Sequence, residues 1–329
     1  MIKKTKKIDT ALIGCGYWGT NIARTLVNLK KESFFVFDEN HSNSKILESR
    51  FPKNIIIEKQ INNIFINENI KNIILATPPI KNFTLIKKAI KCKKNLFVEK
   101  PGLKNFSEIN KISKIKNSRT LMFGYIYIYN NYINFIKKFI SNKKNGKIVY
   151  IKFQRQNLGP IRNDVSVSYD LSSHDLSILF YFLKKLPKKI QENSYSILKK
   201  NLPDISNLSS RIKNIYIDIN NSWLNPDKVR RITIITTTKM LLFDEMKDKD
   251  KIKIYNKYAK YPKISFFDSK FFNTKAKIYH GKNYSPNVKS NDALKDELRH
   301  FFMCVKTKKK PITDINFAIN ILKTLKKIN

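Results

Sequence analysis

A glycine-rich segment between an apolar strand and a helix is the feature that most constrains the fold. Residues 8–13 form a β-branched apolar run, the sequence GCGYWG follows at residues 14–19, and residues 20–30 have helical apolar spacing. In a GxGxxG segment the first glycine permits a tight turn, the second lets the backbone approach a pyrophosphate, and the third allows close helix packing. The helix N-terminus supplies donors to phosphate groups. The residues expected at a dinucleotide are Gly14, Gly16, Tyr17, Trp18 and Gly19.

The same strand–helix alternation continues to residue 124. Further strands are predicted at residues 34–38, 55–57, 73–76, 96–98 and 120–123, and further helices at residues 42–50, 82–92 and 107–116. Nearly all-apolar strands that alternate with helices predict a parallel sheet covered on both faces. We therefore expect an α/β protein whose first domain, residues 1–124, is a Rossmann domain.

An acidic residue ends the second predicted strand, 19 residues beyond Gly19. At that position the carboxylate of Asp38 can accept a hydrogen bond from a ribose 2′-hydroxyl and repel a 2′-phosphate. Asp38 therefore favours NAD as the cofactor over NADP. A glycine turn with a capping aspartate is the alternative interpretation.

Two further segments follow predicted strands of the same sheet. Thr77 and Pro78 come after the fourth strand, and Glu99 and Lys100 come after the fifth. Because ligands of open α/β sheets bind at the carboxyl ends of the strands, all four residues are expected beside the cofactor. Lys100 would project toward the nicotinamide, although it could instead be one of many surface lysines.

The alternation of strands and helices ends after residue 124. Helices are predicted at residues 131–140, 173–183, 293–306 and 315–326, and strands at residues 148–156, 211–220, 229–238, 239–244 and 252–255. Long alternating runs are typical of an antiparallel sheet with one covered face. We expect residues 125–329 to form a second α/β domain with a large, mainly antiparallel, open-faced sheet. Its closing helices can pack back on the first domain.

Asp170 and His174 stand four residues apart near the start of a predicted helix. That spacing places them on one helix face, where a carboxylate can orient an imidazole and raise its basicity. The pair predicts a general base that works near neutral pH. A structural histidine at a helix end is the alternative.

These motifs together resemble the Gfo/Idh/MocA oxidoreductases, and the resemblance extends over nearly the whole chain. The segments that carry it are GCGYWG, ATPP, EKP, DLSSHDLSIL, RQNLGPIRNDV, SWLNPDKVRRITI and the closing ELRHFFMCV. The likeness is to a bacterial surface-polysaccharide subgroup that oxidises nucleotide sugars, typically at C3 of a UDP-N-acetyl-hexosamine or its uronic acid. It implies that Lys100 hydrogen-bonds the reacting hydroxyl, that His174 is the acid/base with Asp170 as its partner, and that the chain forms a homodimer or homotetramer.

The sequence departs from the family pattern at two positions. Asn82 stands where a histidine often lies beside the cofactor, and Tyr125 follows the glycine that usually precedes a histidine. Both residues can still hydrogen-bond, so the resemblance implies that Asn82 contacts the cofactor and that Tyr125 contacts the substrate. A dehydrogenase of a free polyol or sugar remains an alternative, because the catalytic residues are common to the family.

Two arginines flank the segment NLGP in a chain that carries most of its positive charge on lysine. Arg155 and Arg162 can each bind a diphosphate or sugar carboxylate through two parallel hydrogen bonds. The alternative is that they pair with acids such as Asp164. The residues expected at the substrate are Arg155, Asn157, Arg162, Asp175 and Tyr125.

The net charge is +40, from 65 basic and 25 acidic residues. The excess is spread evenly over both halves and consists mainly of lysine, whereas nucleic-acid recognition favours clustered arginine. We expect a lysine-rich solvated surface and no specific nucleic-acid partner, with a non-catalytic NAD- or polyanion-binding protein as the alternative. Three cysteines without a CxxC pair, and no apolar run of bilayer length, predict a cytoplasmic protein without metal site or membrane span.

Overall fold

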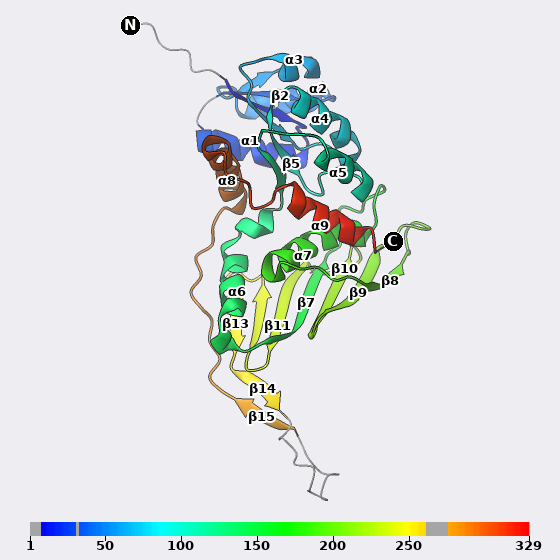
Figure 1. The fold of residues 1–329 in the computed structure, drawn as a ribbon, viewed down its shortest axis with the longest axis vertical. Helices are drawn as coiled ribbons and strands as arrows, with labels where there is room; N and C mark the ends of the chain where they lie inside the picture. The colour runs from blue at the N-terminus through cyan, green and yellow to red at the C-terminus, as the bar shows by residue number, and fades with distance from the viewer. Residues whose placement is uncertain (1–7, 31–32, 261–275, 329) are drawn as a thin grey trace, which may run out of the picture. The chain divides into compact units, whose positions relative to one another are not determined.

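The computed structural model describes residues 8–30, 33–260 and 276–328, which fold into two compact units (Figure 1). The first unit comprises Met1–Tyr129 and Asn291–Lys326, and the second comprises Asn130–Ser290 and Lys327–Asn329. This division differs from the boundary expected at residue 124, since the first unit extends to Tyr129 and includes the closing segment.

The first unit contains a six-stranded parallel sheet with the order β3-β2-β1-β4-β5-β6, which confirms the predicted Rossmann sheet. Every residue of β1, β4 and β6 is buried, because helices cover both faces of the sheet. The strands are β1 Thr10–Ile13, β2 Phe34–Phe37, β3 Ile55–Ile57, β4 Asn72–Leu75, β5 Asn95–Glu99 and β6 Leu121–Gly124. The helical segments are α1 Tyr17–Lys30, α2 His41–Arg50, α3 Ile61–Ile66, α4 Pro79–Lys91, α5 Phe106–Ser113 and the 3-10 turn η1 Ile126–Tyr129. The strand order reverses between β1 and β4, where such sheets bind their ligands.

The two closing helices belong to this unit. Helix α8 (Ala293–Thr307) packs against α1 and η1, and α9 (Ile315–Leu325) packs against α5 and β6. Leu294, Leu298 and Phe301 recur at helical spacing and form the buried face of α8. The amide of Phe123 donates to the Thr313 carbonyl at 2.8 Å and joins β6 to the connection between α8 and α9.

The second unit contains a seven-stranded sheet with the order β13-β12-β11-β7-β10-β9-β8. Only the β7–β10 pair is parallel among these strands, so the expected mainly antiparallel sheet is confirmed. The strands are β7 Ile148–Gln156, β8 Ile190–Tyr195, β9 Ile205–Ile212, β10 Ile215–Ser222, β11 Val229–Thr236, β12 Met240–Asp244 and β13 Ile252–Tyr255; a separate ribbon pairs β14 Lys257–Lys260 with β15 Lys277–His280.

One face of this sheet is covered by α6 (Asn131–Ser141) and α7 (Val167–Leu183), and a short turn η2 (Lys143–Asn145) follows α6 (Figure 1). The alternation along β7 and β10 divides the side chains between the two faces. Ile151 and Ile217 are buried, whereas Tyr150 and Tyr216 stack on each other with ring centroids 5.7 Å apart and remain partly exposed. One covered face and one open face agree with the alternating sequence pattern.

The structure corrects two local predictions. The run at residues 211–220 is not one strand: β9 and β10 form a hairpin around Lys213, whose φ of 53° reverses the chain. Helix α7 starts at Val167 and not at residue 173, because the Ser166 hydroxyl caps it by accepting from the Tyr169 amide at 3.2 Å. Helix α3, strand β8 and the β14–β15 ribbon were not predicted.

Candidate active site

The three glycines of the loop between β1 and α1 lie in different surroundings. Gly14 has a φ of +96°, and a Cβ there would lie 2.6 Å from the Ala76 carbonyl oxygen. A Cβ at Gly19 would lie 2.0 Å from the carbonyl oxygen of Gly14, so α1 can approach β1 only without a side chain there. A Cβ at Gly16 would meet nothing within 4 Å. The exposed open space at Gly16, at the start of α1, fits the approach of a pyrophosphate.

Asp38 lies against this loop in the position that the sequence predicted. Its Oδ2 accepts from the Cys15 amide at 2.6 Å, and its Oδ1 accepts from the Asn40 amide at 2.9 Å. The carboxylate therefore holds the loop in shape and places a negative charge beside it. This charge supports the expected discrimination against a 2′-phosphate.

Asn82 joins two of the segments that follow strands. Its side chain is fully buried; Oδ1 accepts from the Thr77 hydroxyl at 2.5 Å, and Nδ2 donates to the Gly102 carbonyl at 2.8 Å. Both ends of the Asn82 amide are therefore engaged within the protein, and its predicted contact with the cofactor stays a prediction. The amide is engaged in fixing the β4 and β5 loops to each other, while Pro78 is exposed at the start of α4.

Glu99 and Lys100 lie at the carboxyl end of β5, and the Lys100–Pro101 peptide bond is cis. The Lys100 amide donates to Oε2 of Glu99 at 3.2 Å. Burial raises the pKa of Glu99 to about 7, while the Trp18 indole and the Lys100 charge act in the opposite direction. The Trp18 indole therefore lies near the Glu99 carboxyl group. Tyr17, by contrast, is 86% exposed.

Tyr125 lies in the interior of the first unit. Its side chain is fully buried, and its ring centroid is 5.1 Å from that of Phe317 on α9. The ring of Tyr125 follows the buried strand β6 and packs in the core, and its predicted contact with the substrate stays a prediction.

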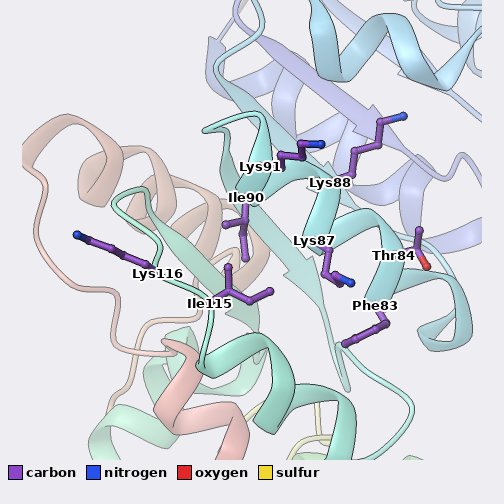
Figure 2. Close-up of a pocket in the computed structure, with 8 residues that line it drawn as sticks. All are labelled: Phe83, Thr84, Lys87, Lys88, Ile90, Lys91, Ile115 and Lys116. Carbon is purple, nitrogen blue, oxygen red and sulfur yellow. The ribbon is translucent and has the colours of Figure 1, made fainter.

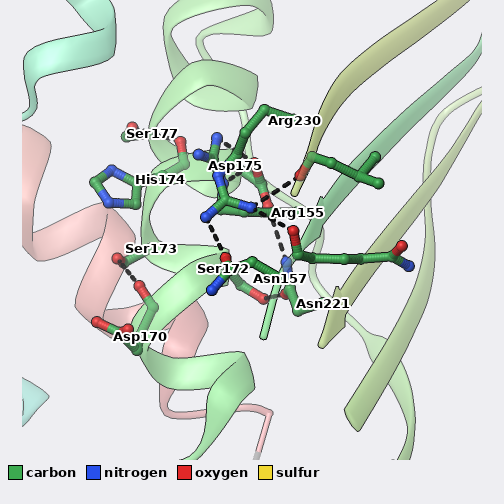
Figure 3. A network of polar contacts seen from close by, with 12 residues as sticks. Arg155, Asn157, Asp170, Ser172, Ser173, His174, Asp175, Ser177, Asn221 and Arg230 are labelled. Atoms are coloured by element: carbon green, nitrogen blue, oxygen red, sulfur yellow. Dashed lines mark hydrogen bonds and ion pairs between the residues drawn. The ribbon is translucent and has the colours of Figure 1, made fainter. Parts of the chain in front are cut away.

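Asp170 and His174 lie one turn apart within α7. The Asp170 carboxylate is 3.6 Å from Nη1 of Arg162, whose guanidinium also donates to both oxygens of Asp164, at 2.9 and 2.6 Å. The pKa of Asp164 is held below its usual value by that hydrogen-bonded pair. Figure 3 shows the His174 ring on the side of α7 away from the sheet strands. Arg162, Asp170 and His174 therefore bring two charges and an imidazole to one stretch of the second unit.

Arg155 and Asp175 form a buried ion pair between β7 and α7. Arg155 on β7 donates to Oδ1 of Asp175 through Nε at 3.1 Å and Nη2 at 3.0 Å, and only 6% and 2% of their side chains are exposed (Figure 3). Asn221 on β10 donates to the other oxygen of Asp175 at 3.1 Å and accepts from Ser172. This buried pair fixes α7 to the sheet, and the predicted contacts of both residues with the substrate stay predictions.

Asn157 follows β7 and is held by an arginine that the sequence did not single out. Arg230 donates to the Asn157 side-chain oxygen and, at 2.9 Å, to the Gln156 carbonyl. Arg230 and Asn221 both lie opposite Arg155 in the sheet register. Only that register brings them together, and no local sequence signal indicates it. Another residue not predicted, Glu297, did have a signal: it is an acid on the apolar face of a helix.

A surface pocket of about 580 Å³ lies elsewhere on the first unit (Figure 2). It contains none of the predicted site residues and is lined by Phe83, Thr84, Lys87, Lys88, Ile90, Lys91, Ile115 and Lys116. Within the described ranges, His, Cys, Asp and Glu side chains do not gather in a group of three that could hold a metal ion. None of the helices in the described part of the chain has the length and apolar character that a bilayer crossing requires.

The parallel sheet, the open glycine loop and the acid beside it define the class: an NAD-binding oxidoreductase domain. Residues 8–127 match the model of the Gfo/Idh/MocA family, described as an oxidoreductase family with an NAD-binding Rossmann fold. This match over the NAD-binding domain confirms the resemblance seen in the sequence and supports an NAD(P)-dependent oxidoreductase, with NAD as the favoured cofactor.

Solved structures with the same fold match nearly the full chain at low identity. UDP-N-acetylglucosamine 3-dehydrogenase GnnA from Acidithiobacillus ferrooxidans has a TM-score of 0.79 and 16% identity, with 98% of this chain and 96% of that chain covered. GenD2 from gentamicin A biosynthesis, in complex with NAD, has a TM-score of 0.78 and 14% identity, with 98% and 93% covered. An oxidoreductase from Agrobacterium radiobacter in complex with NAD+, L-tartaric acid and magnesium has a TM-score of 0.77 and 12% identity, with 98% and 96% covered. No curated protein sequence matches the chain significantly.

The loop geometry predicts opposite effects for two glycine substitutions. Gly16→Ala should leave the thermal midpoint of unfolding unchanged, because its Cβ meets open space, but weaken NADH binding about tenfold or more, about 1.4 kcal/mol. Gly19→Ala should instead destabilise the fold by about 1–3 kcal/mol, because its Cβ collides with Gly14. Fluorescence titration and circular dichroism measure the two effects. Wild-type NADH affinity in Gly16→Ala would show that no pyrophosphate approaches this residue.

Asp38 should set the preference between NADH and NADPH through its charge. Asp38→Asn removes the negative charge and keeps one side-chain oxygen, which can accept from only one of the Cys15 and Asn40 amides. We expect the ratio of the two dissociation constants to narrow about tenfold, about 1.4 kcal/mol. The titrations require matched ionic strength, because the basic surface attracts the extra phosphate. Tighter binding of NADPH than of NADH by the wild type would contradict the assignment.

The Arg155–Asp175 pair should contribute far more to the free energy of unfolding than the Arg162–Asp164 pair. Arg155→Met leaves Asp175 buried without its cation and should lower the free energy of unfolding by about 3–5 kcal/mol. Arg162→Met, at a side chain that is 32% exposed, should cost less than about 1 kcal/mol. Urea unfolding compares them, and Arg155→Met/Asp175→Leu should recover most of the loss. Equal costs for the two single variants would be inconsistent with a structural role for Arg155.

Proposed function

We propose that the protein oxidises a sugar hydroxyl with NAD as the hydride acceptor, and that its substrate is a UDP-linked N-acetyl-hexosamine or hexosaminuronate oxidised at C3. The observation that carries the proposal is the position of Lys100. It follows a buried carboxyl at the carboxyl end of β5, in the same sheet edge as the open glycine loop. An ammonium there can donate a hydrogen bond to a hydroxyl oxygen as it loses its hydrogen.

The chemistry divides between the cofactor and the chain. Bound NAD supplies the nicotinamide that accepts the hydride. Lys100 orients the reacting hydroxyl and stabilises the negative charge that develops on its oxygen. His174 takes the hydroxyl proton, since an imidazole accepts and releases protons near neutral pH. Asp170, one turn earlier on α7, is the proposed partner of His174 and also attracts Arg162.

Arg162 is the proposed anchor for the anionic part of the substrate. Its guanidinium is 32% exposed, unlike that of Arg155, and it lies within 3.6 Å of Asp170, one turn from His174. A planar guanidinium binds a diphosphate or carboxylate through paired hydrogen bonds. The lysine-rich surface adds a long-range attraction for a negatively charged substrate.

The fold relationship supports a nucleotide sugar over a free polyol. The UDP-N-acetylglucosamine 3-dehydrogenase GnnA shares the fold across 98% of this chain, and the sequence segments around residues 154–175 resemble the polysaccharide subgroup. We place the protein in surface-polysaccharide or lipopolysaccharide sugar synthesis, as a cytoplasmic homodimer or homotetramer associated through the open face of the second sheet. A non-catalytic NAD- or polyanion-binding role is disfavoured because Lys100 and His174 are both present.

A panel of UDP-sugars, followed by NADH absorbance, tests the proposal. A UDP-N-acetyl-hexosamine or its uronic acid should give turnover, and the corresponding free sugar should not, because the diphosphate supplies much of the binding energy. Arg162→Lys should raise the KM for the nucleotide sugar about tenfold, about 1.4 kcal/mol, without weakening NAD binding. Comparable kcat/KM on a free hexose or inositol would favour the polyol alternative.

Variants of the two catalytic residues are the controls for this screen. His174→Asn and Lys100→Met should each lower turnover by about 10²–10⁴ while NAD affinity stays near that of the wild type. Near-full turnover in either variant, with the chemical step shown to be rate-limiting, would remove that residue from the mechanism.

A further inference from the structure

A second carboxyl group lies beside Glu99 in the interior of the first unit. Glu297 on α8 is 0% exposed, and its charge interaction with Glu99 raises its pKa in addition to burial. Within the described ranges, Oε1 of Glu99 and both oxygens of Glu297 are buried without a hydrogen bond of normal geometry. Two ionised carboxylates in such surroundings repel each other and lose their hydration.

Packing on two sides holds the Glu99 and Glu297 side chains in place. Leu294, Leu298 and Phe301 press the face of α8 that carries Glu297 into the unit, and the Phe301 ring meets Phe97 of β5 edge-on at 5.9 Å. On the other side, a Cβ at Gly124 would lie 3.0 Å from Oε2 of Glu99. The lack of a side chain at Gly124 therefore makes room for the Glu99 carboxyl.

The neighbours of the two acids are unequal, so the proton has a preferred site. Glu99 has the Lys100 charge, the Lys100 amide at 3.2 Å and the Trp18 indole to stabilise its ionised form. At Glu297 only the Tyr125 amide offsets burial and the Glu99 charge, which hold its pKa well above the ordinary value. Neighbouring carboxyls in unequal surroundings divide into an acid and a carboxylate.

Two further titratable groups near the pair, His300 and Tyr125, have other partners. Nε2 of His300, on the next turn of α8, accepts from the Ile312 amide at 3.1 Å, and its ring lies against that of Tyr129 at 5.5 Å. The Tyr125 ring packs on Phe317. Lys100 is therefore the cation whose charge acts on the pair.

We propose that Glu297 is a neutral acid in the working protein, that it shares its proton with Glu99, and that it thereby holds the Glu99 carboxylate against Lys100. Glu297 is then a positioning residue, because it acts on the reaction through Glu99 and Lys100. The pair carries one negative charge, which balances the Lys100 ammonium, and the shared proton supplies a donor to two carboxyl groups whose Oε1 atoms are buried without a hydrogen bond of normal geometry in the described part of the chain. The link to catalysis rests on the role proposed for Lys100, whereas the protonation state does not.

The protonation of Glu297 is tested by infrared spectroscopy on the protein without substrate. Infrared spectra of the wild type at pH 7 should contain the carbonyl stretching band of a protonated, buried carboxyl group. Isotopic labelling of glutamate should shift this band, and Glu297→Gln should remove it. The matched control Asp296→Asn changes the adjacent, partly exposed carboxyl of α8 and should leave the band in place. Absence of the band in the wild type, or its persistence in Glu297→Gln, overturns the proposal.

The pH dependence of unfolding gives a second, independent measure. In the unfolded chain Glu297 releases its proton above the ordinary glutamate pKa of 4.5, whereas in the folded wild type it keeps the proton to higher pH. The free energy of unfolding therefore falls as pH rises from 4.5 toward the pKa of Glu297 in the folded protein. Glu297→Gln lacks this proton. The unfolding equilibrium constant of the wild type, divided by that of Glu297→Gln, should therefore rise with pH, by at most about tenfold per unit. A ratio that stays flat between pH 5 and about 8 overturns the proposal.

The positioning role is tested by comparing two substitutions. Glutamine can still donate a hydrogen bond to Glu99, whereas leucine cannot, so Glu297→Leu should lower kcat about 10- to 100-fold and Glu297→Gln should restore most of it. The KM for NAD should change little in both variants. Equal losses in both would refute positioning by a hydrogen bond. If Lys100→Met retains full turnover while the infrared band is present, the proposed function fails and the shared proton stands.

Discussion

The close approach of backbone segments at the carboxyl edge of the first sheet is the constraint on which the site depends. Gly19 lets α1 reach the Gly14 carbonyl, and Gly14 in turn presses against Ala76 at the end of β4. From there Thr77 bonds Asn82, and Asn82 bonds Gly102 beyond β5. Three loops are thereby fixed to one another before any ligand binds, and preorganised backbone is what a dinucleotide site requires.

Both units bury charge, and they stabilise it by different means. In the second unit the Asp175 carboxyl group is paired with the Arg155 guanidinium, and Asn221 donates to its other oxygen. In the first unit burial and the Glu99 charge raise the pKa of Glu297, so in our proposal a proton takes the place of the arginine. Desolvation is the common cost, and the position of each acid decides the solution. The arginine pair secures a helix, whereas the proton-sharing pair adjoins a lysine with a proposed part in the reaction.

The sequence predicted the features that depend on local spacing. The GxGxxG loop, Asp38 beside it and the parallel sheet all follow from periodicity and from the order of strands and helices. The sequence did not reveal that Arg155 and Asp175 are partners, because they are 20 residues apart on different elements. Their contact with Asn221 depends on the register of β7 and β10. Asn82 looked like a ligand contact for the same reason: only the fold shows that Gly102 uses its amide. The hairpin at Lys213 was missed because the alternating isoleucines continue through the turn.

The two kinds of basic residue serve different ends in this chain. Lysine forms most of the +40 surface, where a mobile ammonium needs only water around it. Four arginines bind neighbouring groups through the guanidinium: Arg155 binds Asp175, Arg162 binds Asp164, Arg230 binds the Asn157 loop, and Arg231 binds Asp244. All four lie in the second unit, on β7, β11 or the segment before α7. An ammonium cannot reproduce two parallel hydrogen bonds, so positive charge alone does not define this region. The Arg155 guanidinium fixes the sheet to α7, whereas the partly exposed Arg162 guanidinium is held by Asp164, which an anionic ligand would have to replace.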